Sequence, residues 1–358
     1  MTAPIGDWNG EELHIHHDLP SDAWIAIAIH STRRGQAIGG TRWREYRSLD
    51  DAVTDVLRLS RGMTLKAAVA GLPSGGAKAV ISGGVGLSGP EREALLERYG
   101  ELIEGLGGRF ATGPDIGTVE TDMDVIGRRT EHVFCRTVEH GGSGTPSPWT
   151  ALGVLAGIHA SLGHATGSAD VGGRRVLIQG AGEVGRALAG LLHAAGAHVL
   201  VSDVDATRVS NVVESLRGAE RIAPDAVLST ECDVFAPCAV GAILNPGSIP
   251  VLRCAVVAGS ANNQLLSDQD AEALRRREIL YAPDFVINSG GLIRGVGAER
   301  LGWSDTLIRE RIEAIGDTLL EIFRRADAAG ITTHAAALAM AAEADLADSG
   351  RLTATTAS

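Results

Sequence analysis

Large and small apolar side chains alternate at residues 24–29, and this pattern predicts a β-strand early in the chain. Residues 48–67 open with a capping box and then carry apolar residues at helical spacing, which predicts a helix. We expect a Gly-Gly turn at residues 75–76, a strand directly after it, and a second amphipathic helix over residues 91–106. Strand and helix patterns thus alternate along the first third of the chain.

The second half shows a similar alternation after residues 139–148, a segment rich in Gly, Ser and Pro that has the composition of a linker. A helix is predicted over residues 149–162, and a strand–helix–strand pattern covers residues 174–203. Further strands are expected at residues 234–237, 254–258 and 279–282, and further helices at 304–323 and 333–347. The alternation predicts an α/β fold with two domains, residues 1–147 and 148–324.

Composition narrows the class of protein. A chain of 358 residues is long enough for two domains with good cores. The net charge of −12, with no basic run to offset it, argues against nucleic acid or an anionic membrane as a general partner. The four cysteines contain no C-x-x-C pair, which is typical of reduced thiols and gives no zinc pattern. With no signal-peptide pattern and no apolar run of membrane-spanning length, we expect a cytoplasmic protein.

Two lysines, Lys66 and Lys78, lie in a stretch that is otherwise almost free of charge, residues 61–80. Desolvation and like charge both lower a lysine pKa, which would suit one lysine to hold an anion and the other to move protons. The stretch by itself is equally consistent with stems that lie along an apolar surface while the ammonium groups reach water. Asp115 follows a predicted strand at residues 109–114, where α/β proteins place reactive side chains, and is the candidate proton partner.

Gly180, Gly182 and Gly185 form a G-x-G-x-x-G pattern between a strand and a helix inside a complete βαβ pattern. Asp203 ends the second strand, 21 positions after Gly182, and completes a Rossmann-type dinucleotide fingerprint. Asp203 would accept hydrogen bonds from the ribose hydroxyls and repel a 2′-phosphate, which favours NAD over NADP, with Arg208 as the nearby cation that weakens this preference. Other cofactor contacts are expected from Glu183 and Val184 in the same loop and from Cys238 and Ala239 in a loop after a later strand.

Three histidines, His14, His16 and His17, resemble metal ligands in type. They lie in one short segment of alternating polar and apolar residues, and no distant partner is evident. We therefore interpret them as the solvated face of a strand and predict no metal site.

The motifs together resemble the Glu/Leu/Phe/Val dehydrogenase family, and the resemblance covers nearly the whole chain. Within the family the chain is similar to the shorter, actinobacterial phenylalanine dehydrogenases. The resemblance rests on residues 39–42, 61–66, 72–78, 113–115, 147–150, the dinucleotide fingerprint, 232–238, 261–263, 288–291, 301–304 and 314–318. Members of this family oxidatively deaminate amino acids with a nicotinamide cofactor.

The resemblance implies a role for each matching residue. Lys66, with Gly40 and Asn262, would bind the substrate carboxylate. Lys78 would activate water, and Asp115 would exchange protons with the substrate amine. Thr150, Asn262 and Asn288 would lie at the nicotinamide end of the cofactor. The resemblance also implies a cleft between the two domains, a C-terminal segment at about 325–358 that returns to the first domain, and a homo-oligomer.

The pocket positions implied by the resemblance are Ile38, Gly113, Leu292 and Gly295, and all four are apolar. They predict a hydrophobic L-amino acid as substrate and a 2-oxo acid and ammonia as products. Gly113 and Leu292 favour phenylalanine, with leucine, valine and tryptophan as alternatives, because small differences of fit discriminate weakly. A catalytically silent NAD-binding sensor on the same fold is the alternative from another class.

One residue departs from the family pattern. Many members have a third glycine directly before the catalytic lysine, and this chain has Ala77 there. The methyl group fits most backbone conformations, so we expect activity to survive unless the position requires a positive φ.

Overall fold

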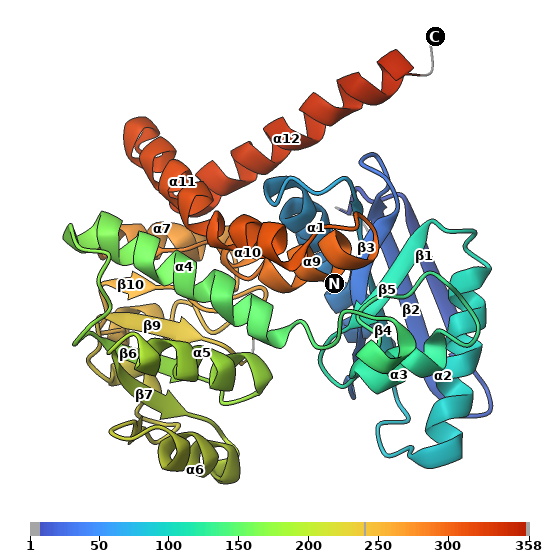
Figure 1. Cartoon of the computed structure of the whole chain (residues 1–358), viewed down its shortest axis with the longest axis horizontal. Helices are drawn as coiled ribbons and strands as arrows, with labels where there is room; N and C mark the ends of the chain where they lie inside the picture. Colours follow the sequence, from blue (N-terminus) through green and yellow to red (C-terminus); the bar gives the residue numbers. More distant parts are fainter. Residues whose placement is uncertain (1–7, 240, 356–358) are drawn as a thin grey trace. The chain divides into compact units, whose positions relative to one another are not determined.

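The structure of the chain is a computed structural model that describes residues 8–239 and 241–355. It divides into two compact units (Figure 1). Unit 1 comprises Met1–Thr145, Gly295–Gly302 and Ala341–Ser358, and unit 2 comprises Pro146–Arg294 and Trp303–Met340.

Unit 1 contains a five-stranded mixed sheet in the order β1-β2-β4-β3-β5. The strands are β1 (Glu12–Asp18), β2 (Ala23–Ser31), β3 (Ala37–Trp43), β4 (Gly75–Ser82) and β5 (Phe110–Pro114). Strands β3, β4 and β5 run parallel, whereas β2 is antiparallel to both β1 and β4. The helices are α1 (Leu49–Val69), α2 (Gly89–Glu104) and α3 (Glu120–Ile126), with a short 3-10 helix, η1 (Val138–His140).

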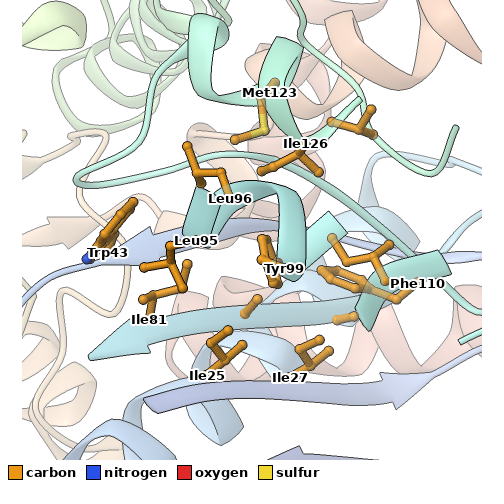
Figure 2. Packing of buried hydrophobic residues seen from close by; sticks show 14 of the residues in the cluster. Ile25, Ile27, Trp43, Ile81, Leu95, Leu96, Tyr99, Phe110, Met123 and Ile126 are labelled. Atoms are coloured by element: carbon orange, nitrogen blue, oxygen red, sulfur yellow. The ribbon is translucent and has the colours of Figure 1, made fainter. Parts of the chain in front are cut away.

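The predicted alternation on β2 separates the two faces of this sheet. Ile25 and Ile27 pack under Leu95 and Tyr99 of α2 (Figure 2). The small residues between them belong to a second buried cluster on the opposite face, which includes Val56 of α1. Because side chains alternate along a strand, small residues on one face let α1 approach the sheet closely.

Unit 2 contains a parallel six-stranded sheet in the order β11-β10-β9-β6-β7-β8. Its strands are β6 (Arg175–Gln179), β7 (His198–Ser202), β8 (Glu220–Arg221), β9 (Val234–Pro237), β10 (Val256–Val257) and β11 (Leu280–Tyr281). This is the strand order of a dinucleotide-binding Rossmann fold, with the change of direction between β6 and β9. The predicted α/β fold with a Rossmann-type domain is therefore confirmed.

Helices accompany the strands of unit 2. They are α4 (Ser147–Thr166), α5 (Glu183–Ala194), α6 (Ala206–Ser215), η2 (Val227–Ser229), η3 (Ile249–Val251), α7 (Asp268–Arg276), α8 (Asp284–Ile287), α10 (Asp305–Glu313) and α11 (Ile315–Ala329). Two more helices, α9 (Gly290–Glu299) and α12 (Thr333–Thr355), begin in unit 2 and end in unit 1. Within the described residues, no helix is both long and apolar enough to cross a membrane.

Three expectations differ from the structure. Residues 75–76 form no turn but begin β4, and the reason for glycine there is close packing: a Cβ on Gly76 would lie 2.0 Å from the Thr64 nitrogen. The single helix expected at 304–323 is divided at Ala314 into α10 and α11. The return to the first domain, expected at about 325, comes later, because α11 packs against α4 within unit 2.

Candidate active site

Lys66 and Lys78 are the only lysines in the sequence, and every other basic side chain apart from histidine is arginine. Lys66 lies in the last turn of α1 and Lys78 in the middle of β4, and both are buried. An arginine stays charged at any ordinary pH, whereas a desolvated lysine can lose its proton near neutrality. The chain thus places both of its lysines at buried positions of unit 1.

Lys78 forms a buried ion pair with Asp115. The Lys78 Nζ lies 3.0 Å from Asp115 Oδ2, and the two side chains are 5% and 14% exposed. Burial lowers the pKa of Lys78; the charge of Asp115 opposes this shift, and the charge of Arg42 adds to it. Burial alone would raise the pKa of Asp115, but the charges of Lys78 and Arg42 outweigh it and hold that pKa below its ordinary value. The pair therefore combines an easily deprotonated amine with an ionised carboxylate.

Strand period explains why separate segments meet on one face. Gly40 and Arg42 on β3, Lys78 on β4 and Asp115 just after β5 share the face that α1 covers. Glycine on β3 also allows the close approach: a Cβ on Gly40 would lie 2.9 Å from Asp115 Cβ. The Asp115 backbone is held in turn, because its N–H donates to Thr118 Oγ1 at 2.9 Å.

The dinucleotide fingerprint of unit 2 has the local geometry that its spacing predicts. Gly180 has a φ of +105°, which favours glycine, and Gly182 is the N-cap of α5. A Cβ on Gly185 would lie 1.9 Å from the Gly180 carbonyl oxygen. Glu183 and Val184 form the first turn of α5, so backbone N–H groups at the start of this helix can hold phosphate oxygens.

Asp203 and Arg208 both lie at this loop. The Asp203 carboxylate accepts hydrogen bonds from the backbone N–H groups of Ala181 and Asp205, at 2.7 Å and 2.9 Å. Arg208 pairs with Asp205 at 3.4 Å, and its Nη1 would lie 3.9 Å from a Cβ on Gly182. The predicted acidic residue thus also supports the loop, and the predicted cation lies beside it.

The residues expected at the nicotinamide end are close together in unit 2. Asn288 Nδ2 donates to Ser260 O at 3.0 Å and to Asn262 Oδ1 at 2.8 Å. Asn288 Oδ1 is buried and has no hydrogen-bond partner among the residues that the structure describes, so it can accept a bond from a carboxamide –NH2. Thr150 lies near this segment, since a Cβ on Gly291 would be 2.5 Å from its Oγ1. These donors and acceptors fit a nicotinamide cofactor.

The loop after β9 borders the fingerprint. The Cys238 N–H donates to Gln179 O at 2.7 Å, and a Cβ on Gly180 would lie 2.8 Å from Ala239 Cβ. Burial raises the pKa of the Cys238 thiol, so it is a neutral part of the loop.

Comparison with known proteins identifies the family. Residues 21–132 match the profile described as "Glu/Leu/Phe/Val dehydrogenase, dimerisation domain", and residues 201–348 match "Glutamate/Leucine/Phenylalanine/Valine dehydrogenase". The chain is 42% identical over 333 residues to the leucine dehydrogenase of Thermoactinomyces intermedius (93% of this chain, 90% of the relative). It is 42% identical over 332 residues to the valine dehydrogenase of Streptomyces virginiae (91% of each). The crystal structure of L-tryptophan dehydrogenase from Nostoc punctiforme superimposes with a TM-score of 0.77 at 37% identity (97% of this chain, 99% of that chain).

The chain belongs to the Glu/Leu/Phe/Val dehydrogenase family. It is an amino-acid dehydrogenase, an oxidoreductase that acts on CH–NH2 donors. Members of this family depend on NAD or NADP, which agrees with the fingerprint and the Asn288 geometry.

The residues that the resemblance implies for substrate binding belong partly to unit 1 and partly to unit 2 by their position in the chain. Ile38, Gly113 and Gly295 are buried in unit 1, whereas Leu292 and Asn262 belong to unit 2. In unit 1 the space beside both glycines is taken by Phe134: its ring would lie 2.6 Å from a Cβ on Gly113 and 3.0 Å from one on Gly295. The space beside Gly113 and Gly295 is thus partly filled by a ring of the chain itself.

Phe134 begins a loop that α9 holds in place. Glu299 Oε1 accepts hydrogen bonds from the backbone N–H groups of Cys135 and Ser143, at 2.8 Å and 2.9 Å, and from the Ser143 hydroxyl at 2.5 Å. Cys135 has a φ of +56°, which is unusual for a residue other than glycine. Phe134 and Glu299 were not predicted from the sequence, since neither lies in a motif with a known spacing.

Arg42 and Asp55 are further residues that the sequence analysis did not assign. Arg42 lies in the quoted Gly39–Arg42 motif, which was the available signal, and Asp55 is a carboxylate within the largely apolar pattern of α1. In the structure Arg42 contacts both Asp115 and Asp55.

The histidine segment lies on β1, away from this network. His14 pairs with Glu12, and His17 pairs with Asp22 and stacks on Trp24. Across the described part of the chain, no group of three His, Cys, Asp or Glu side chains is arranged to hold a metal ion.

Proposed function

We propose that the chain catalyses the NAD-dependent, reversible oxidative deamination of a hydrophobic L-amino acid to the 2-oxo acid and ammonia. The buried Lys78–Asp115 pair, at 3.0 Å, carries this proposal. Deamination needs a base that is neutral near physiological pH and a carboxylate that exchanges protons with the amine. Burial lowers the pKa of Lys78, which suits it to be the base, and Asp115 is the ionised carboxylate beside it.

The residues divide the steps among them. Lys66 holds the substrate carboxylate as a cation, and Asp115 accepts a proton from the substrate ammonium group. NAD, when bound, supplies the acceptor for the hydride that leaves Cα. Lys78 takes a proton from the water that adds to the resulting iminium carbon. Asp115 then returns its proton to the nitrogen. The C–N bond breaks and ammonia leaves, while the hydroxyl proton passes to the Asp115 carboxylate as the carbonyl forms.

NAD is proposed as the cofactor because of Asp203. A carboxylate at this position accepts hydrogen bonds from ribose hydroxyls and repels a 2′-phosphate. Arg208, beside Gly182, reduces this preference without removing it, because its own guanidinium is paired with Asp205. Comparing kcat/KM with NAD and with NADP tests the proposal, and a higher value with NADP would contradict it.

The substrate is proposed to be uncharged and apolar, because Ile38, Gly113, Leu292 and Gly295 carry no polar side chain. Phenylalanine is the amino acid that Gly113 and Leu292 favour. A branched aliphatic amino acid is the second candidate, and the position of Phe134 against Gly113 and Gly295 favours it, because less room remains for an aromatic ring. The relatives described above are named for leucine, valine and tryptophan.

Initial rates of NADH formation decide among these substrates. The panel is L-phenylalanine, L-leucine, L-valine, L-tryptophan and L-glutamate at alkaline pH, compared by kcat/KM. A hydrophobic amino acid should exceed glutamate by orders of magnitude, and a preference for glutamate would contradict the proposed class. Intact NAD binding without turnover of any amino acid would support the silent NAD-binding sensor instead.

A homo-oligomer is proposed as the assembly. Its support is the match of residues 21–132 to a domain described as a dimerisation domain. Sedimentation of the purified chain at micromolar concentration tests it, and a monomer would contradict it.

A further inference from the structure

A row of side chains with alternating charge continues from the Lys78–Asp115 pair into unit 1. Asp115 Oδ2 lies 3.0 Å from Lys78 Nζ and also accepts a hydrogen bond from Arg42 Nε at 3.0 Å. Arg42 Nη1 donates to Asp55 Oδ2 at 2.9 Å. The same Asp55 oxygen accepts the hydroxyl of Tyr46 at 2.6 Å. Two cations and two carboxylates thus alternate, with a neutral hydroxyl at the end.

Four different segments bring these groups together, and the Asp55 end is more exposed than the Lys78 end. Lys78 on β4 is 5% exposed, Arg42 on β3 is 9% exposed, and Asp55 on α1 is 23% exposed. A buried charge without a partner is costly, so each member depends on the next. The ion pair with Asp55 therefore fixes the position of Arg42, and the ion pair with Arg42 fixes the position of Asp115.

Arginine is suited to this place because it does not exchange its proton. Burial opposes the charge on Arg42, yet Asp115 and Asp55 together raise its pKa above the ordinary value. Burial and the bond to Asp55 likewise raise the pKa of Tyr46, so its hydroxyl stays a neutral donor. Protons can therefore move only at the Lys78–Asp115 end, while the Arg42 end supplies fixed charge and orientation.

We propose that Arg42, anchored by Asp55, is the positioning residue of the Lys78–Asp115 pair, which it orients and whose charge balance it sets together with Asp55. The proposal rests on the proposed function and deepens it, because Arg42 and Asp55 would act through Lys78 and Asp115. The charged groups around Lys78 are Asp115, Arg42 and Asp55, and Lys66 on α1 is the other lysine of this unit.

The two charges act on Lys78 in opposite directions. Arg42 lowers the pKa of Lys78, and Asp55 raises it. In deamination Lys78 must be neutral to accept a proton, so activity falls as pH drops through its pKa. Removing the positive charge should move this acid limb of kcat/KM to higher pH, and removing the negative charge should move it to lower pH.

The test compares Arg42→Gln and Asp55→Asn, both of which keep a polar group of similar size. We expect the acid limb to shift upward by about one pH unit in Arg42→Gln and downward by about half a unit in Asp55→Asn, since Asp55 is farther away. Arg92→Gln is the matched control, because Arg92 forms a comparable ion pair with Asp122 in the same unit at 2.7 Å. The acid limb of kcat/KM should lie at the same pH in Arg92→Gln as in the unsubstituted chain.

A second measurement follows Lys78 without relying on turnover. The pH dependence of acetylation at the Lys78 peptide, measured by mass spectrometry, reports its pKa, and assignment is simple in a chain with two lysines. The pKa should rise in Arg42→Gln and fall in Asp55→Asn. Shifts in the same direction, or no shift in either variant, would overturn the inference. Failure of the unsubstituted chain to form NADH would contradict the proposed function, whereas the Lys78 titration would still decide this inference.

Discussion

The candidate site of unit 2 is formed mainly by backbone, whereas the candidate site of unit 1 is formed by charged side chains. In unit 2 the fingerprint is a backbone site, in which Gly180, Gly182 and Gly185 shape one loop and the start of one helix. In unit 1 the candidate site consists of charged side chains from three strands and a helix, with Lys78, Arg42 and Asp115 on one face of the sheet. A backbone site tolerates any residue that fits the backbone, whereas a side-chain site depends on particular charges. Substitutions should therefore separate binding in one unit from chemistry in the other.

Lys78→Ala should have the largest effect on turnover, and it would separate catalysis in unit 1 from NADH binding in unit 2. We expect kcat to fall by about 10³-fold, because general base catalysis contributes on that order. NADH binding, measured by fluorescence, should be unchanged, because the fingerprint lies in unit 2. Lys66→Ala is the useful contrast, since loss of the carboxylate partner should raise KM strongly. Turnover by Lys78→Ala near the original rate would contradict the assigned role.

Gly185→Ala tests the backbone site. The added Cβ would lie 1.9 Å from the Gly180 carbonyl oxygen, so the loop must shift. Overpacking of this kind costs about 1–3 kcal/mol, which corresponds to roughly fivefold to 150-fold weaker NADH binding if the loop carries the strain. Gly190→Ala on the same helix is the control, because nothing lies within 4 Å of its added Cβ apart from the adjoining residues and the helix's own backbone. Equal binding by both variants would show that the close approach is not required.

Asp18→Asn tests a structural charge of unit 1 that lies outside the catalytic pair. Asp18 is 2% exposed, and its bond to Arg98 holds its pKa below the ordinary value. A depressed carboxylate pKa stabilises the fold above pH 3.8, and this contribution is lost as pH falls through the folded-state pKa. We expect the free energy of unfolding to drop by about 2 kcal/mol at pH 7 and the difference to shrink below pH 3.8.

Urea denaturation at pH 7 and at pH 3 measures this effect. Asp22→Asn is the control, because the Asp22 side chain is 92% exposed and adopts a φ that asparagine tolerates. A difference between Asp18→Asn and the parent chain that does not change with pH would argue against an electrostatic origin.

Phe134→Ala should have the smallest effect, and it tests whether Phe134 influences the choice between phenylalanine and leucine as substrate. Removing the ring beside Gly113 and Gly295 leaves room for a larger side chain. The ratio of kcat/KM for phenylalanine to that for leucine should rise by about tenfold, which is typical of a change in apolar fit. Val138→Ala in the nearby 3-10 helix η1 should leave the ratio unchanged, because Val138 is 71% exposed. An unchanged ratio in Phe134→Ala would place the substrate side chain elsewhere.

Much of the fold was predictable because its signals are local. The alternation at residues 24–29, the cap at Ser48 and the βαβ unit each depend on a few neighbouring residues, and the structure confirms all of them. The question about Ala77 is also answered, because it lies within β4 and is absent from the described residues with positive φ. The binding roles assigned to the fingerprint residues stay predictions.

The wrong predictions concern residues whose local pattern is explained by contacts with segments far away in the sequence. Two adjacent glycines usually indicate a turn, but Gly75 and Gly76 are required because Ser31 and Thr64 press against them from other segments. Likewise, the apolar spacing of residues 304–323 predicted one continuous helix and not the break at Ala314.

The sequence by itself determined the fold class, the position of the dinucleotide loop and the two lysines, because spacing along the chain decides hydrogen bonding and face within one element. The tertiary structure alone decided that Lys78 contacts Asp115, that Arg42 joins Asp115 to Asp55, and that Phe134 fills the space beside two distant glycines. These contacts join residues that are tens to hundreds of positions apart. Their energies depend on burial and on neighbouring charges, which exist only after the strands have been brought together.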